Sequence, residues 1–337
     1  IIFTINNMAK TSLRRKFFYA VTILLVIVLL IFYFRRTMSL DDIKRRINKL
    51  EDMDDRILDH LKSSILRITP PPIAAPVEES YMTGSKYLKV RNQGYCGSCT
   101  AFTLSSTMAT NYSKANDIEV PVLSPQMLLS CRSYYNEYGR EGLPCSGWST
   151  LSWAVSLKEN IYNPFSYLPL EIEVPYLMGV CDDDDDECSI IPTEEINLSC
   201  NPGDNDNTLL SARHEAYSVE RIRVCSYSGD SSAMNINQIK SYIVIYGAVA
   251  VAINIFENFV SVDSFPHEYT PGSDDSSEIL GGHAVTIVGW RPGWWRIMNS
   301  WGTSWGDKGF FWLKWGGLMK KSYVFATVVG HSIKNGP

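Results

Sequence analysis

A cysteine stands in a sequence context that suits covalent catalysis by a thiol. Cys99 follows Gly94 and Gly97, and the run from Thr100 to Tyr112 has the pattern of an amphipathic helix. The start of a helix stabilises negative charge through its dipole and its exposed N–H groups, and the thiolate is the reactive form of cysteine. We therefore expect Cys99 to be a nucleophile whose own N–H faces the oxyanion that its attack would form.

A histidine and an asparagine further along the chain can assist such a thiol. His283 follows Gly281 and Gly282 and opens an apolar run that we expect to be a strand. An imidazole can accept the thiol proton and return it to a leaving group. Asn299 begins an Asn-Ser-Trp-Gly segment, in which the amide oxygen can hold the imidazole N–H and the Trp301 indole can shield that bond from water.

The first part of the chain predicts a membrane anchor. Residues 17–34 read FFYAVTILLVIVLLIFYF, carry no charge and are flanked by Arg and Lys on both sides. About 20 apolar residues span a bilayer, and aromatic residues favour its two interfaces. We expect a short tail over residues 1–16 and an uncleaved anchor over 17–34 that contacts the lipid bilayer. A cleaved signal peptide is the alternative, but the run ends in Tyr33-Phe34-Arg35-Arg36 rather than in small residues.

A predicted helix and a spacer follow this anchor. From Leu40 to Ile65 the apolar positions recur in steps of three and four, so residues 37–69 are expected to contain an amphipathic helix. It is interpreted as a solvated stalk, as a coiled coil that allows self-association through residues 40–65, or as a remnant pro-segment that packs on the domain. Prolines between 70 and 76 predict a stiff linker over residues 70–79. A folded domain is expected over 80–337.

Within this domain the pattern predicts helices in the first half and strands in the second. Ser124 and Pro125 are residues that favour the start of a short helix. Residues 236–246 have a helical pattern, and 248–255 and 283–290 read as buried strands. This order indicates the α+β class.

Composition and cysteine placement indicate a packed domain in an oxidising compartment. Hydrophobic residues make up 45% and aromatic residues 12% of the chain, and a net charge of −5 gives no reason to expect nucleic acid binding. All eight cysteines lie between positions 96 and 225, which favours disulfides over reduced cytosolic thiols. The domain is therefore expected to be lumenal, extracellular, or inside a vesicle or enveloped particle. Asn111-Tyr-Ser and Asn197-Leu-Ser are then permissive for glycosylation.

Three segments together resemble the papain family of cysteine peptidases. They are QGYCGSC, GGHAV and NSWGTSWGDKGFF, with 184 residues from Cys99 to His283 and 16 from there to Asn299. The resemblance covers roughly residues 80–330. It implies a papain-like two-lobed α+β fold, with a helical lobe and a β-barrel-like lobe, and a reaction that needs no metal or cofactor.

The resemblance also implies a role for each residue of the site. Cys99 attacks the scissile carbonyl as a thiolate and forms a thioester, and His283 protonates the leaving amine. Asn299 fixes the His283 ring. Gln93 donates its side-chain amide to the oxyanion alongside the Cys99 N–H. Trp301 covers the bond between histidine and asparagine.

The resemblance places further residues in the walls of the substrate cleft. Trp148 stands where the family has a second glycine, so it either narrows the cleft or is a packing residue. Tyr323 matches loosely an acidic residue at the base of the main pocket of cathepsin B-like members, which would favour apolar or aromatic substrate residues. The implied substrate-binding set is Gly147, Trp148, Gly282, Trp301 and Tyr323.

The resemblance further implies disulfides. It pairs Cys96 with Cys145, and Cys131 with Cys181 or a later cysteine such as Cys200. With Cys99 kept as a thiol, seven cysteines remain, so at least one is unpaired or joined to another chain. The pairing among Cys181, Cys188, Cys200 and Cys225 is left open.

The layout is most similar to cathepsin B-like peptidases, but it lacks the pair of histidines that gives those enzymes dipeptide trimming. Residues 182–187 read Asp-Asp-Asp-Asp-Asp-Glu instead. We therefore expect a membrane-anchored endopeptidase with polypeptide substrates. Thr100, where the family usually has tryptophan, and Trp148 support an alternative: a weakly active or inactive structural protein of a membrane or enveloped particle. A transferase or amidase that uses the same three residues is a third hypothesis.

Overall fold

The computed structural model describes most of the predicted peptidase domain. The described residues are 40, 79–130, 145, 147, 149–159, 167–177, 214–227, 233–272, 278–319 and 322–334. All of them belong to the second of two units, Ile1–Ser39 and Leu40–Pro337. The predicted anchor at 17–34 lies outside the described residues, as do residues 41–78 of the predicted stalk and linker. None of the helices described in the remaining ranges is long and apolar enough to cross a membrane.

The helices and strands follow one another in the order that the sequence predicts, with most helices first. The helices are η1 (Ser85–Tyr87), α4 (Cys99–Asn116), α5 (Gln126–Ser130), α6 (Thr150–Glu159), α8 (Ala233–Tyr246) and η4 (Glu257–Asp263). The strands are β1 (Tyr81–Met82), β2 (Tyr167–Leu168), β3 (His214–Tyr227), β4 (Val249–Phe256), β5 (Glu268–Tyr269), β6 (Ile279–Arg291), β7 (Trp294–Met298), β8 (Phe310–Lys314) and β9 (Tyr323–Lys334).

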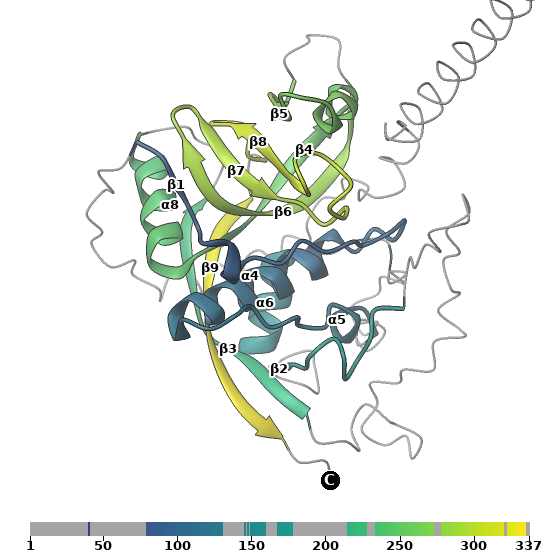
Figure 1. Cartoon of the computed structure of the whole chain (residues 1–337), viewed down its shortest axis with the longest axis vertical. Coiled ribbons are helices and arrows are strands. Elements are labelled where there is room, and N and C mark those ends of the chain that lie inside the picture. Colours follow the sequence, from purple (N-terminus) through teal and green to yellow (C-terminus); the bar gives the residue numbers. More distant parts are fainter. Residues whose placement is uncertain are drawn as a thin grey trace, which may run out of the picture. The chain divides into compact units, whose positions relative to one another are not determined.

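The described strands form one mixed sheet in the order β2-β3-β9-β4-β6-β7-β8-β5, and β1 pairs with β6 beside this path. Neighbouring strands are antiparallel except β5 and β8, which are parallel. Helices α4 and α6 pack on each other and against β9 and β3, as Figure 1 shows in blue, teal and yellow. The predicted α+β class is therefore confirmed.

The boundaries of the predicted helices and strands agree with those in the structure to within a few residues. Helix α8 contains the predicted residues 236–246, and β4 matches the predicted strand 248–255. The side-chain oxygen of Ser124 accepts a hydrogen bond from Met127 N at 3.4 Å, so it caps α5 as expected. Strand β6 begins at Ile279 rather than at His283, because the residues before the histidine continue the ladder with β4.

Helix α4 is buried along most of its length. It begins at Cys99, directly after Ser98, and ends where Asp117 adopts a left-handed conformation with φ of 53°. The run of small side chains in α4 includes Ala101, Ser105 and Ala109, which are all buried. Small residues allow the helix to lie close to its neighbours, and α4 packs against both β9 and β6. The helix can therefore bring its first residue to the central strands.

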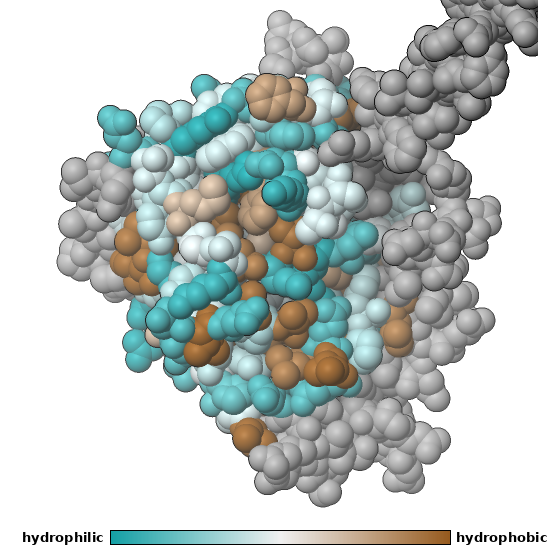
Figure 2. All heavy atoms as spheres, in the orientation of Figure 1, coloured by the Kyte–Doolittle hydropathy of each residue, from teal (hydrophilic) through white to brown (hydrophobic). Residues whose placement is uncertain are grey.

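Two groups of side chains form the core on either side of this helix-to-sheet contact. One buried cluster joins α4, α5 and α6 to β3 through residues such as Leu104, Leu128, Trp153 and Val219. A second group is aromatic and gathers around Phe259 next to β5 and β8. On the face that Figure 2 shows, hydrophilic side chains lie between scattered apolar ones, which is the usual surface of a protein whose large apolar side chains are buried.

One buried amide joins three elements of this core. Asn111 in α4 donates from Nδ2 to Thr327 O in β9 at 3.1 Å and accepts at Oδ1 from Ala248 N at 2.9 Å. Only 3% of its surface is exposed. The amide cannot carry a glycan in the folded domain, so the prediction that Asn111 is permissive for glycosylation is wrong. Asn197, the second candidate, lies outside the described residues.

We predict that Asn111→Ala lowers the free energy of unfolding by about 2–5 kcal/mol, because two buried backbone groups lose their partner. Chemical denaturation of both proteins measures the difference. Asn116→Ala is the matched control, since it removes an exposed bond to Tyr112 O from the same helix and should change stability by less than about 0.5 kcal/mol. Equal stability of Asn111→Ala and the parent would contradict the role of this amide.

Candidate active site

The expected nucleophile lies at the junction of a helix and the sheet. Cys99 is the first residue of α4, and the carbonyl of Ser98 accepts hydrogen bonds from the N–H groups of Ala101 and Phe102. The Cys99 side chain is a buried thiol. Its Sγ accepts a hydrogen bond from Ala284 N in β6 at 3.5 Å. The structure therefore brings the helix start and the residue after His283 into contact.

The expected base and its orienting residue are bonded to each other. His283 lies in β6 opposite Ile253 of β4. Its Nε2 is 2.8 Å from Asn299 Oδ1, and both side chains are buried. Because an amide oxygen can only accept, this bond places the proton on Nε2 and leaves Nδ1 as the basic nitrogen of the neutral ring. Asn299 follows β7 directly, and its N–H donates to Gly309 O at 2.9 Å.

The Trp301 ring, which is expected to cover this bond, lies beside the His283 ring. The centroids of the His283 and Trp301 rings are 4.9 Å apart, with an angle of 36° between the planes. Trp301 itself packs against Phe259 and Trp305, and all three are buried. A hydrogen bond in such a water-poor environment is electrostatically stronger than one in water. Trp301 therefore helps to keep the imidazole in one orientation.

Gln93 is buried beside the start of the helix, and both the oxygen and the nitrogen of its side-chain amide form hydrogen bonds. Oε1 accepts from Ser300 Oγ at 2.6 Å, and Nε2 donates to Cys96 O at 2.8 Å. The Gln93 backbone N–H also donates to Ser300 O at 2.8 Å. An amide nitrogen carries two hydrogens, so the bond to Cys96 does not by itself prevent donation to an oxyanion.

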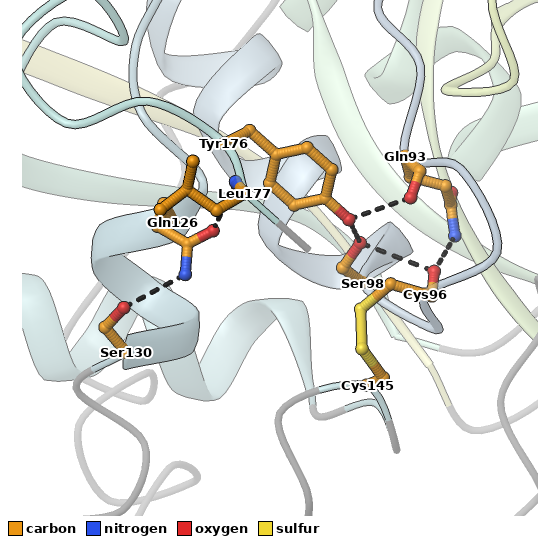
Figure 3. Close-up of a disulfide and its surroundings, with 8 residues drawn as sticks. All are labelled: Gln93, Cys96, Ser98, Gln126, Ser130, Cys145, Tyr176 and Leu177. Atoms are coloured by element: carbon orange, nitrogen blue, oxygen red, sulfur yellow. Dashed lines mark hydrogen bonds between the residues drawn. A yellow bond between two sulfur atoms is a disulfide. The ribbon is translucent and has the colours of Figure 1, made fainter. Parts of the chain in front are cut away.

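The turn before the nucleophile carries a disulfide. Cys96 is joined to Cys145, with 4.8 Å between the Cα atoms, and Figure 3 shows this bond beside Gln93 and Ser98. This is the pairing that the resemblance implies. The other predicted disulfide cysteines, Cys131 and Cys181, lie outside the described residues.

The expected cleft residues are only partly described. Gly282 directly precedes His283 in β6, and Gly147 has a φ of 81°, which favours glycine. Trp148 lies outside the described residues. Tyr323 begins β9 opposite Tyr227 and packs against the cluster that joins the helices to β3. Their roles in substrate binding stay predictions.

Sequence reasoning missed two residues that hold the site together. Ser300 donates its hydroxyl to Gln93 Oε1, and its N–H donates to Asn299 Oδ1 at 2.9 Å. Its position directly after Asn299 was a signal that it could act there. Tyr176 donates its hydroxyl to Gln93 O at 2.8 Å, and no motif of the sequence marks it.

Comparison with known proteins agrees with this geometry. The family model described as "Papain family cysteine protease" matches residues 78–323. The chain is 28% identical over 252 residues to cathepsin B-like cysteine proteinase 3 of Caenorhabditis elegans, covering 72% of this chain and 61% of that protein. It is 26% identical over 236 residues to cathepsin B-like cysteine proteinase 1 of Haemonchus contortus, covering 66% and 62% respectively. The chain thus spans about three fifths of the length of these curated relatives.

Solved structures share the fold. Xylellain, a cysteine protease from Xylella fastidiosa, has a TM-score of 0.56 at 20% identity, covering 84% of this chain and 96% of that one. The procathepsin B S9 structure from Trypanosoma congolense has a TM-score of 0.54 at 14% identity, covering 87% and 89%. The expected papain-like fold is therefore present. From the family match over residues 78–323, the chain belongs to the papain family of cysteine proteases.

Proposed function

We propose that this protein is a membrane-anchored cysteine endopeptidase that cleaves peptide bonds through Cys99, His283 and Asn299. The observation that carries the proposal is the junction of α4 and β6. There the Cys99 sulfur lies 3.5 Å from Ala284 N, and the neighbouring His283 is held by Asn299 at 2.8 Å. A thiol at a helix start beside an oriented imidazole is the arrangement that nucleophilic catalysis needs.

The reaction follows from these positions. His283 takes the Cys99 proton, and the thiolate attacks the scissile carbonyl carbon to form a tetrahedral oxyanion. The Cys99 N–H and the Gln93 side-chain amide are the proposed donors to this oxyanion. The C–N bond then breaks, His283 protonates the leaving amine, and a thioester remains on Cys99. Water activated by His283 attacks the thioester and releases the acid.

The substrate class is proposed from the family and from the sequence. The curated relatives are named cathepsin B-like cysteine proteinases, which supports polypeptide substrates here. The acidic run at residues 182–187 stands where cathepsin B-like members have a loop with paired histidines. The absence of such a pair in the sequence supports cleavage within chains rather than removal of dipeptides.

The location of the domain is also a proposal. The uncharged apolar run at 17–34 supports a single-pass anchor in the lipid bilayer. The Cys96–Cys145 disulfide supports placing the domain on the side of the membrane that faces an oxidising compartment. Residues 40–65 are the proposed segment for self-association, since their apolar positions share one helical face.

A thiol-directed peptidyl epoxide tests the proposal directly. We expect one covalent adduct per chain, located on Cys99 by peptide mass spectrometry, and no adduct with Cys99→Ala. A native protein that stays unlabelled while Cys99 is reduced would contradict the peptidase and favour the inactive structural protein. Labelling without cleavage of any member of a peptide library would favour a transferase or an amidase.

Turnover of variants gives a second test. Cys99→Ala should lower kcat by more than about 10³-fold, as loss of a catalytic nucleophile does. Asn299→Ala should lower kcat less, by roughly 10²-fold, because His283 can still transfer protons but is no longer held in one orientation. Asn116→Ala, at the exposed end of α4, is the matched control and should keep the parent kcat. Equal losses for Asn299→Ala and Asn116→Ala would refute the orienting role.

A further inference from the structure

We propose that Tyr176 is a positioning residue for the oxyanion side of the site, acting through Gln93 and Ser98; this inference rests on the proposed peptidase function. The Tyr176 hydroxyl is 2.8 Å from Gln93 O and 2.9 Å from Ser98 Oγ, and Figure 3 shows both hydrogen bonds meeting at the tyrosine oxygen. Tyr176 is 77 residues from Cys99 in the chain. It therefore reaches the site only through the fold.

The direction of both hydrogen bonds follows from the groups involved. A carbonyl can only accept, so the single Tyr176 hydroxyl hydrogen goes to Gln93 O. Ser98 must then donate to the Tyr176 oxygen. Its other neighbour, Cys96 O, is farther away at 3.4 Å. The tyrosine oxygen thus connects Gln93 and Ser98, the first and last residues of the turn that precedes the nucleophile.

This turn carries one proposed oxyanion donor and directly precedes the other. Gln93 provides its side-chain amide at the start of the turn. Ser98 ends the turn, and the N–H of the next residue, Cys99, is the other donor. Within the turn, Cys96 O accepts from Gln93 Nε2 at 2.8 Å and from Ser98 N at 2.7 Å. Tyr176 adds a second connection that comes from a different part of the chain. The distance between the donors therefore depends on Tyr176 as well as on the turn itself.

The tyrosine is itself held in place from two helices. Its ring meets the edge of Phe102, one turn after Cys99 in α4, with centroids 4.7 Å apart and planes at 88°. The N–H of the next residue, Leu177, donates to Gln126 Oε1 of α5 at 3.0 Å, as Figure 3 also shows. Burial raises the pKa of the Tyr176 hydroxyl above its ordinary value. The group therefore remains a donor at neutral pH.

Removing the hydroxyl should weaken oxyanion stabilisation without removing a donor. Loss of an entire oxyanion donor costs about 10²–10³ in kcat, so we expect Tyr176→Phe to lower kcat by roughly tenfold. KM should stay within about twofold, because the ground-state contacts of the substrate are not touched. The rate of Cys99 alkylation by iodoacetamide should stay near that of the parent, since alkylation forms no oxyanion.

A double-mutant cycle with Gln93→Ala tests the inference. We expect Tyr176→Phe to lower kcat about tenfold in the parent and less than twofold in the Gln93→Ala background, since coupled residues are not additive. Tyr217→Phe is the matched control: it removes a hydroxyl bonded to Glu215 Oε2 from another buried tyrosine and should leave kcat unchanged. If Tyr176→Phe does not fold, Ser98→Ala removes the second of the two bonds and should lower kcat with iodoacetamide reactivity kept.

Two results would overturn the inference in an active parent. One is a parent-like kcat in Tyr176→Phe, and the other is an equal loss in both backgrounds of the cycle. A parent that neither reacts with the epoxide nor cleaves peptides would instead contradict the proposed function, and the role of Tyr176 would fall with it. The first assay on the parent therefore separates the two failures.

Discussion

The contact between the first turn of α4 and strand β6 is the constraint on which the proposed chemistry depends. Cys99 and His283 are 184 residues apart in the sequence, and the proposed reaction needs both side chains. The contact between Cys99 Sγ and Ala284 N, the residue after His283, joins a buried helix to a strand paired with β4. Displacement of a catalytic group by about 1 Å can lower the rate about 10²-fold. Rigid elements are therefore suited to hold these two side chains.

A chain of polar groups crosses the same junction. Tyr176 donates to Gln93, Ser300 donates to the Gln93 side chain, and Asn299 accepts from both Ser300 and the His283 ring. Each of these bonds pairs polar groups in a buried site, where an unpaired polar group is costly because of the low dielectric constant. The proposed base and the proposed oxyanion side of the site are therefore joined by one connected network.

The sequence could single out the candidate reacting groups because their local contexts are distinctive. Two glycines precede the helix that begins at Cys99, and a glycine pair precedes His283. Both patterns could be recognised in the sequence because there is a direct physical reason for glycine beside each side chain. The helix at 236–246 and the strand at 248–255 were also readable from their periodicity. The Cys96–Cys145 disulfide was predicted from the family resemblance and is present in the structure.

Contacts between distant segments were beyond such reasoning. Asn111 reads as a possible glycosylation site, but the fold buries its amide between α4, β9 and the start of β4. Tyr176 lies in no motif, and the packing of its ring on Phe102 and the bond from Leu177 N to Gln126 hold it at the turn. Strand β6 begins four residues before the predicted start at His283, because pairing with β4 extends the strand through Gly281 and Gly282.

We propose that His283 and the start of α4 together hold Cys99 as a thiolate at neutral pH. The most direct test measures the rate of Cys99 alkylation by iodoacetamide as a function of pH. An ordinary thiol titrates near pH 8.5, whereas a paired thiol at a helix start titrates between about 3.5 and 7.5. We expect a midpoint in this lower range that moves toward 8.5 in His283→Ala. A midpoint near 8.5 in the parent would contradict it.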